Sequence, residues 1–571
     1  MASGIWAPIK RLLEKIPQRE RNHSLAFLNC AQFFQALNDN IFKLIMVFLI
    51  IQIQGPDKAS TILSAAGAIF VIPFLLFSST AGVLADRFSK QRVIFMMKWA
   101  ETIIMGLAIV AFSLKSVWGS YTLLFFLAMH SALFSPAKYG IIPEIVPKNK
   151  ISRANGLVTS FTYLAIIIGT FFASFITEIT HRNFPLIAGF CLLNAIIGLL
   201  SAWGIKPTPA QGSQKKITPF FVREIYQTLV FCRQKKHLLT AIFGSAFFLF
   251  IGAFTQLNII PFAIQSLHLE DIGGGYLFLA TALGIACGAY IGGKVSKKRV
   301  ELGLSCIAGL LLSLLLFLLG SYHTNLVIDV LFLILLGVCG GIFIVPFDTF
   351  IQTFSPQEKR GQSIAAANFL SFTGVLLASF CLFFFSDILT LTAAGGFVLV
   401  GAITLLFTLY LICALSDHAF SFCARFLLKP FLRVSTTNLQ LVEKSATPFL
   451  ILQEGSWFKA LLLMSVVPQV QLLIPTEKKR KYSWINLFSS LHYISIQDKF
   501  EAIRAEAAEK TEEKGIPCLF QHSAFAQTPF ERQKGWKAFF SFNQPTILYV
   551  TVKRSREAGT QITFSKDIPG N

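Results

Sequence analysis

Long apolar runs separated by short polar segments make up most of the chain up to about residue 415. A helix of about 20 apolar residues is long enough to cross the hydrocarbon core of a membrane, which is about 30 Å thick. The runs predict twelve such helices, with a longer polar segment after the sixth. The predicted spans are residues 24–51, 59–85, 93–113, 120–143, 154–178, 185–204, 237–265, 272–295, 300–320, 326–350, 362–385 and 390–415.

The composition agrees with a membrane protein. Of the 571 residues, 54% are hydrophobic and 14% are charged, whereas about a quarter of the residues of a soluble protein are charged. We therefore predict an all-α polytopic membrane protein that carries a soluble C-terminal domain. The predicted segments are a basic N-terminal segment (1–23), a six-helix half (24–204), a basic linker (205–236), a second six-helix half (237–415) and the C-terminal domain (416–571).

Positive charge is concentrated in alternate loops. The formal net charge is +21, but Lys and Arg follow the rule that these residues accumulate in cytoplasmic loops, which predicts both termini in the cytoplasm. The alternation favours membrane lipids over nucleic acid as the partner of the basic residues. The basic loops contain Arg87, Lys90, Arg92, Lys148, Lys150, Arg153, Lys215, Lys216, Arg223, Arg233, Lys235, Lys236, Lys297, Lys298, Arg299, Lys359 and Arg360.

The two predicted halves repeat each other. The segment "RFSKQRV" (87–93) follows the second span, and "KVSKKRV" (294–300) follows the eighth. Likewise "FSPAKYGIIPEIVP" (134–147) ends the fourth span, and "IVPFDTFIQTFSP" (344–356) ends the tenth. Parallel six-helix repeats are typical of transporters that work by alternating access, with the substrate site near the membrane midplane between the halves.

Polar side chains inside the predicted spans are candidates for that site, because ionisable groups in hydrocarbon are costly unless they face protein or water. Asp39 and Lys43 are four residues apart on one helix face and can pair, so the alternative to a cavity-lining role is a self-satisfied pair. Lys138 and Asp348 occupy equivalent places in the two repeats and carry opposite charge, which predicts a cross-half pair that acts as a gate. The remaining candidates are Asn40, Gln256 and Asn258, and Glu101 and Glu178 are further acids in the spans.

The segment "AGVLADRFSKQRV" (81–93) resembles the loop signature of the major facilitator superfamily, roughly G-x-L-x-D-R-x-x-[RK]-[RK]. The resemblance implies that this loop helps to latch the two halves together on the cytoplasmic side. Gly82 would allow close helix approach, Asp86 would cap or pair with a neighbouring helix end, and Arg87 and Arg92 would lie at the cytoplasmic headgroups. The second repeat has Gly293 where Asp86 would align, so the latch is predicted to be asymmetric.

The segments "FFQALNDNIFK" and "SPAKYGIIPEIVPKNKISRANGL" resemble the bacterial lysophospholipid transporter branch of that superfamily, and the resemblance covers about residues 24–415. It implies a flippase-type transporter in the bacterial inner membrane that carries lysophospholipid to the cytoplasmic leaflet for re-acylation. One departure is "GAFTQLNII" in the seventh span, where some members carry an arginine.

Residues 416–571 are similar to a glycerophospholipid acyltransferase domain with an α/β fold, whose signature is N-H-x-S-x-x-D. Glu454 stands at the catalytic histidine's position and Lys459 at the aspartate's, while Gln521 and His522 replace part of a second motif. Activation of a lysolipid hydroxyl needs a general base and an acid that orients it, so we expect a degenerate, non-catalytic domain. Such a domain could bind a lysolipid, an acyl donor, an acyl-carrier protein or a separate acyltransferase.

Two other functions remain open at this stage. One is a bifunctional lysophospholipid transporter and acyltransferase, and the other is an exporter of a small solute or drug with the same fold. The ten cysteines are scattered without the spacing of metal ligands, so neither a metal nor a cofactor is expected.

Overall fold

The structure, a computed structural model, describes residues 23–215, 221–269, 271–296, 300–322 and 325–428. Beyond these it describes 435–438, 440, 448–452, 457–467, 470–475, 491–494, 516–520, 546–555 and 559–565. The chain divides into two compact units. The first, which we call the membrane unit, comprises Met1–Val300 and Ala308–Leu405, and the second comprises Glu301–Ile307 and Leu406–Asn571.

Six long helices form the first half of the membrane unit. Their apolar length matches a membrane span, and polar side chains at several ends satisfy free backbone groups. Ser116, for example, accepts a hydrogen bond from Gly119 N at 3.0 Å where the fourth helix begins. The six helices are α3 (Ser24–Gln54), α4 (Ala59–Arg87), α5 (Lys90–Ser113), α6 (Val117–Ile145), α7 (Ile151–Ile179) and α8 (Phe184–Trp203).

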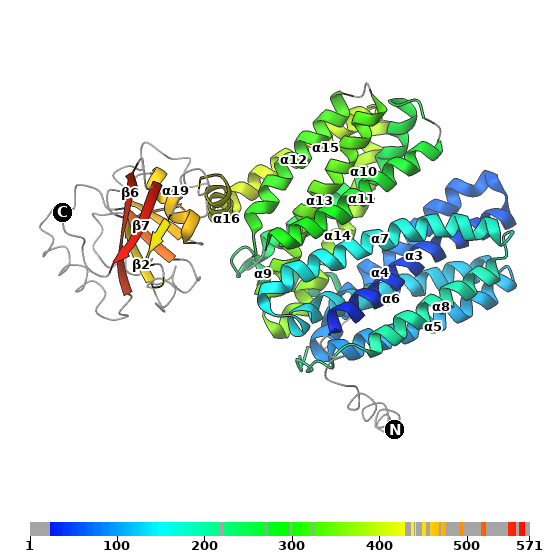
Figure 1. Ribbon diagram of the computed structural model, residues 1–571. Helices are drawn as coiled ribbons and strands as arrows, with labels where there is room; N and C mark the ends of the chain where they lie inside the picture. Colours follow the sequence, from blue (N-terminus) through cyan, green and yellow to red (C-terminus); the bar gives the residue numbers. More distant parts are fainter. Residues whose placement is uncertain are drawn as a thin grey trace, which may run out of the picture. The chain divides into compact units, whose positions relative to one another are not determined.

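Six further long helices form the second half, and Figure 1 shows α10–α15 grouped together in green to yellow, beside the blue-to-teal group α3–α8. They are α10 (Leu238–Gln265), α11 (Asp271–Val295), α12 (Leu302–Ser321), α13 (Leu326–Phe354), α14 (Arg360–Phe383) and α15 (Ala393–Ala414). In the part of the chain that the structure describes, twelve helices are thus long and apolar enough to cross a membrane. The prediction of twelve spans is confirmed.

The helices are longer than several of the predicted apolar runs. For example, α5 begins at Lys90 rather than at residue 93, and α7 begins at Ile151 rather than at residue 154. Polar residues at these ends continue the helix into the interfacial region, which hydropathy alone does not indicate. The linker also contains a helix that the apolar runs did not predict, α9 (Phe221–Arg233).

Glycine residues allow very close packing of α11 on α13. A side chain at Gly284 or Gly288 would collide with the backbone carbonyls of Ile334 and Val338 on α13. Helix association inside a membrane relies on such small residues, because lipid leaves little hydrophobic driving force between helices. Glycines also allow close packing between the halves, because Gly156 on α7 lies against the backbone of α11 at Gly293. A Cβ added to Gly156 would lie 3.0 Å from the Cα of Gly293.

The second unit contains a mixed sheet with strand order β1-β7-β6-β2-β5-β3-β4, parallel except for the antiparallel pair β6–β7. Four strands coincide with apolar runs of the sequence, namely β2 (Pro448–Leu452), β3 (Val470–Pro475), β5 (Ile516–Phe520) and β6 (Thr546–Ser555). The other elements are β1 (Ser435–Thr437), β4 (Leu491–Ile494), β7 (Gly559–Ser565), α16 (Ser416–Cys423) and α19 (Trp457–Val466).

Candidate functional site

Asp39 lies midway along α3 and faces α6. Its Oδ2 accepts a hydrogen bond from Ser131 Oγ at 2.8 Å, and Ser131 in turn accepts one from Gln35 Nε2 at 2.9 Å. Among the residues that the structure describes, Asp39 Oδ1 has no hydrogen-bond partner although the atom is buried. The carboxylate is therefore oriented by one hydroxyl and keeps an acceptor available.

The second half repeats this arrangement with the roles of its helices exchanged. Asp348 lies on α13, the counterpart of α6, and its Oδ1 accepts a hydrogen bond from Ser245 Oγ on α10 at 3.0 Å. Each half thus holds one serine-bound carboxylate, on the first helix of the first half and on the fourth helix of the second.

Lys138 carries a positive charge close to both acids. Electrostatic interactions link its ammonium group to Asp39 and to Asp348. No ion pair joins Lys138 to either of these described residues, and its Nζ instead lies 4.5 Å from the ring centroid of Tyr139. The expected pair between Lys138 and Asp348 is absent in this conformation, because each group has found another partner, and it stays a prediction for the other access state.

Lys43 does not pair with Asp39, contrary to the alternative that the sequence left open. Its Nζ lies over the ring of Phe70 on α4, 5.6 Å from the centroid, while Ser131 occupies one carboxylate oxygen of Asp39. The two charges interact only at longer range. A spacing of four residues permits a pair, but the neighbours on α4 and α6 decide whether it forms.

The three candidate amide side chains form no hydrogen bond with Asp39, Lys138 or Asp348 in the described part of the structure. Asn40 Nδ2 donates to the carbonyl of Ala36 on its own helix at 2.8 Å. Asn258 is buried and donates to the carbonyl of Ala393 on α15 at 2.8 Å. Gln256, on α10, has an exposed side chain. Asn258 therefore has a packing role within the second half in this conformation.

Asp86, at the end of α4, caps the first turn of α14 in the other half. Its Oδ1 accepts a hydrogen bond from Gly361 N at 2.6 Å, and its Oδ2 accepts one from Gln362 N at 2.9 Å. A carboxylate at a helix N-terminus satisfies free N–H groups and interacts favourably with the helix dipole. Gly82, one turn earlier, permits the approach, since a Cβ there would lie 2.8 Å from the Cα of Gln362.

Further polar contacts join the halves at the same end of the bundle. Asn155 on α7 donates to Thr349 Oγ1 at 3.1 Å and exchanges two hydrogen bonds with Gln352 on α13, at 3.0 and 2.8 Å. Arg87 and Arg92 are exposed at this end. We call this end, which contains the loops 88–89, 146–150, 204–215 and 355–359, the basic end.

A buried charged cluster in the first half was only partly recognised in the sequence. Lys98 and Glu101 form an ion pair and are both fully buried. Glu101 Oε1 accepts a hydrogen bond from Asn38 Nδ2 at 3.0 Å, and His130 Nε2 lies 3.9 Å from Glu101 Oε2. The signal available was the spacing of three residues between Lys98 and Glu101, which places both on one helix face.

The altered acyltransferase positions lie mostly outside the described residues. Glu454, Gln521 and His522 are not among them. Lys459 lies on α19 and is partly buried.

Residues 28–379, more than half of the chain, match the Major Facilitator Superfamily, and the chain belongs to this superfamily. Solved structures share the fold. The human organic anion transporter MFSD10 aligns with a TM-score of 0.57 at 13% identity, covering 70% of this chain and all (100%) of that one. A bacterial homologue of the iron transporter ferroportin in an outward-facing state aligns with a TM-score of 0.52 at 14% identity, covering 69% and 99%.

Among curated proteins, the chain is similar to the Lysophospholipid transporter LplT of Yersinia pestis (strain Pestoides F). The two are 28% identical over 353 residues, which cover 61% of this chain and 81% of the relative. The protein is a multi-pass membrane protein of the transporter class, with the all-helical fold predicted from its apolar runs.

Proposed function

We propose that the protein moves lysophospholipid between the leaflets of the bacterial inner membrane by alternating access. The observation that carries the proposal is the group formed by Lys138 and the two serine-bound acids, Asp39 and Asp348, inside an apolar bundle. A lysophospholipid headgroup carries a phosphate and often an ammonium group. A lysine suits the phosphate and a carboxylate with an open acceptor suits the ammonium.

The similarity to lysophospholipid transporters supports this substrate class, because it covers most of the membrane unit. A lysolipid also needs an apolar path for its acyl chain. Phe74 on α4 and Phe372 on α14 stack with centroids 3.9 Å apart. Beyond this contact, away from the basic end, both helices carry exposed apolar side chains, such as Ile72 and Phe380. The acyl chain of the lysolipid would leave the bundle between α4 and α14 while the headgroup stays near Lys138.

The contacts at the basic end correspond to one of the two access states. Asp86 and Asn155 hold the halves together there, and release of these contacts would open the site at this end. The excess of Lys and Arg in its loops supports a cytoplasmic location for the basic end and for both termini. Arg87 and Arg92 would then act at the cytoplasmic headgroups, and Gly82 would allow the close approach of α4 to α14.

Transport in proteoliposomes tests the proposal. We expect a fluorescent lysophospholipid to exchange between leaflets, and we expect Asp39→Asn to slow the exchange strongly without changing the amount of folded protein. Glu178→Gln is the matched control, because Glu178 is an exposed acid at the end of α7. Movement of a soluble solute with no lysolipid exchange would support a small-solute exporter instead.

For the second unit we propose a degenerate acyltransferase-like domain without catalysis. Support comes from Glu454 and Lys459, which stand where the signature needs a histidine and an aspartate. The full-length protein should transfer no acyl group to lysophospholipid from acyl-CoA or acyl-carrier protein. Turnover that survives Glu454→Ala and is lost in His522→Ala would show an active bifunctional enzyme with a relocated base.

A further inference from the structure

Helix α9 in the linker packs one of its faces against the membrane unit. Ile225, Thr228 and Cys232 are buried on this face, and α9 contacts α14, α4 and α10. The ring of Phe221 lies 6.3 Å from that of Phe369 on α14, and Lys359 Nζ lies 3.9 Å above the ring of Phe231. The helix therefore has a fixed place on the basic end of the bundle.

A second apolar face of α9 is left uncovered within the described residues. Val222, Tyr226 and Val230 recur every four residues, so they lie along one side of the helix, and they are 59%, 67% and 42% exposed. A helix whose role is only to pack on its neighbours needs a single apolar stripe. The additional stripe needs an apolar environment of its own.

Basic residues border this stripe. Arg233 lies eleven residues after Val222, which is close to three helical turns and places it on the same side. Arg223 lies at the edge of the stripe, and Lys235 follows the helix; all three side chains are exposed. The one acid of the helix, Glu224, lies on another side and forms an ion pair with Lys215.

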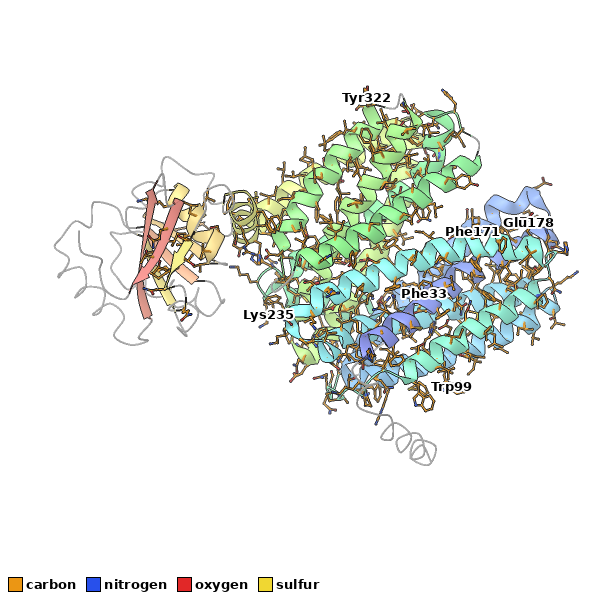
Figure 2. All side chains as sticks on the ribbon, in the orientation of Figure 1. Phe33, Trp99, Phe171, Glu178, Lys235 and Tyr322 are labelled. Atoms are coloured by element: carbon orange, nitrogen blue, oxygen red, sulfur yellow. The ribbon has the colours of Figure 1, made fainter. Side chains whose placement is uncertain are left out.

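The connection to α10 keeps α9 at the membrane boundary. Four residues, 234–237, separate Arg233 from Leu238, where α10 begins as a candidate span. At about 3.5 Å per residue, this segment reaches less than about 20 Å even when extended. Figure 2 shows Lys235, in this segment, at the opposite end of the bundle from Glu178.

We propose that α9 is an interfacial helix that binds anionic phospholipid. Its stripe of Val222, Tyr226 and Val230 would enter the boundary between headgroups and acyl chains, and Arg223 and Arg233 would contact anionic phosphates. Amphipathic helices with basic borders bind membranes in this way, through buried apolar area and attraction to anionic headgroups. The proposal does not depend on which substrate the transporter carries.

Lipid bound to α9 would be linked, through hydrogen bonds and an ion pair, to the contacts that join the two halves at the basic end. Lys215, which pairs with Glu224 of α9, also donates to Gln362 Oε1 at 2.9 Å. Gln362 is one of the two residues whose backbone N–H groups bind Asp86. Anionic lipid held by α9 would therefore stabilise the conformation in which the halves are joined at this end.

A photo-crosslinking experiment on the full-length protein tests the proposal. A benzophenone amino acid replaces Tyr226, and the protein is reconstituted in vesicles of phosphatidylcholine with or without phosphatidylglycerol. We expect lipid adducts on α9, several-fold enriched in phosphatidylglycerol over its share of the vesicle. The same amino acid at Gln227, which is exposed on a different side of α9 and lines a cavity with residues 211–215, should give far fewer lipid adducts.

Charge variants separate headgroup recognition from simple contact with lipid. Arg223→Gln with Arg233→Gln should abolish the phosphatidylglycerol enrichment, whereas Lys115→Gln, at the other end of the bundle, should leave it unchanged. Adducts between position 226 and residues 416–571 would assign the stripe to a protein partner and overturn the proposal. With Arg223 and Arg233 intact, adducts of the two lipids in proportion to their shares of the vesicle would overturn the proposal that α9 prefers anionic lipid.

Discussion

Asp86 Oδ1 accepts a hydrogen bond from Gly361 N at 2.6 Å, so the last turn of α4 caps the first turn of α14 across the two halves. The residues are 275 positions apart in the chain. The cap forms only when the halves are joined at the basic end, and it therefore links a local helix-capping energy to the global access state.

Replacing Asp86 by Asn should shift the protein away from this state. Loss of a capping charge costs about 0.5–2 kcal/mol, which corresponds to a change of roughly 2- to 30-fold in a two-state equilibrium. Distances between spin labels on α4 and α14 at the basic end would report the shift as a larger open population. Lys148→Gln, an exposed change in the loop 146–150 at the same end, is the control; an Asn variant with the wild-type distance distribution would contradict the capping role.

A larger residue at Gly156 should prevent closure of the basic end. In Gly156→Leu, the new side chain would meet the carbonyl of Ala289 on α11, and backbone cannot move aside as a flexible side chain can. We expect almost complete loss of transport with the open population dominant in the spin-label measurement. Gly106→Leu is the matched control, because a Cβ at Gly106 has no atom within 4 Å; equal effects of both variants would indicate a general packing defect.

Removing one charge of the buried pair Lys98 and Glu101 should destabilise the protein more than removing both charges. Glu101→Gln leaves Lys98 without its counter-charge in a fully buried place, a change expected to cost about 3–5 kcal/mol. The double variant Lys98→Met with Glu101→Met should recover much of this loss, because it removes both charges together. Thermal unfolding in detergent compares the two; a double variant that melts below Glu101→Gln would refute the explanation by desolvation.

Exchanging the charges of Lys138 and Asp348 should preserve part of the transport activity. If they pair in the other access state, Lys138→Asp and Asp348→Lys should each reduce lysolipid exchange at least tenfold, and the combination should recover part of the activity. The coupling energy from this double-mutant cycle measures the pair directly. Ser245→Ala, which removes the present partner of Asp348, should have a smaller effect; additive losses in the double variant would exclude the pair.

The sequence predicted the twelve spans because apolar length is a local property that each run carries by itself. It could not predict that Asp86 binds Gly361, since nothing near either residue encodes the distance between two helices from different halves. Lys43 shows the same limit on a smaller scale. Its spacing from Asp39 allowed a pair, but Ser131 on α6 and Phe70 on α4 provide the partners. Helix α9 was missed because its 13 residues are too few for a membrane span and lie within the basic linker.

The glycine contact between α11 and α13 also has a consequence for biosynthesis. Helix α11 leaves the ribosome before α12, yet its glycines fit against the backbone of α13, which is made later. Until α13 is inserted, α11 can rely only on α7 and α10, with which it also packs, and its small residues offer lipid few side-chain contacts. The second half therefore completes its core only when its fourth helix enters the membrane, and a nascent chain that ends within α12 should leave α11 exposed to quality-control proteases.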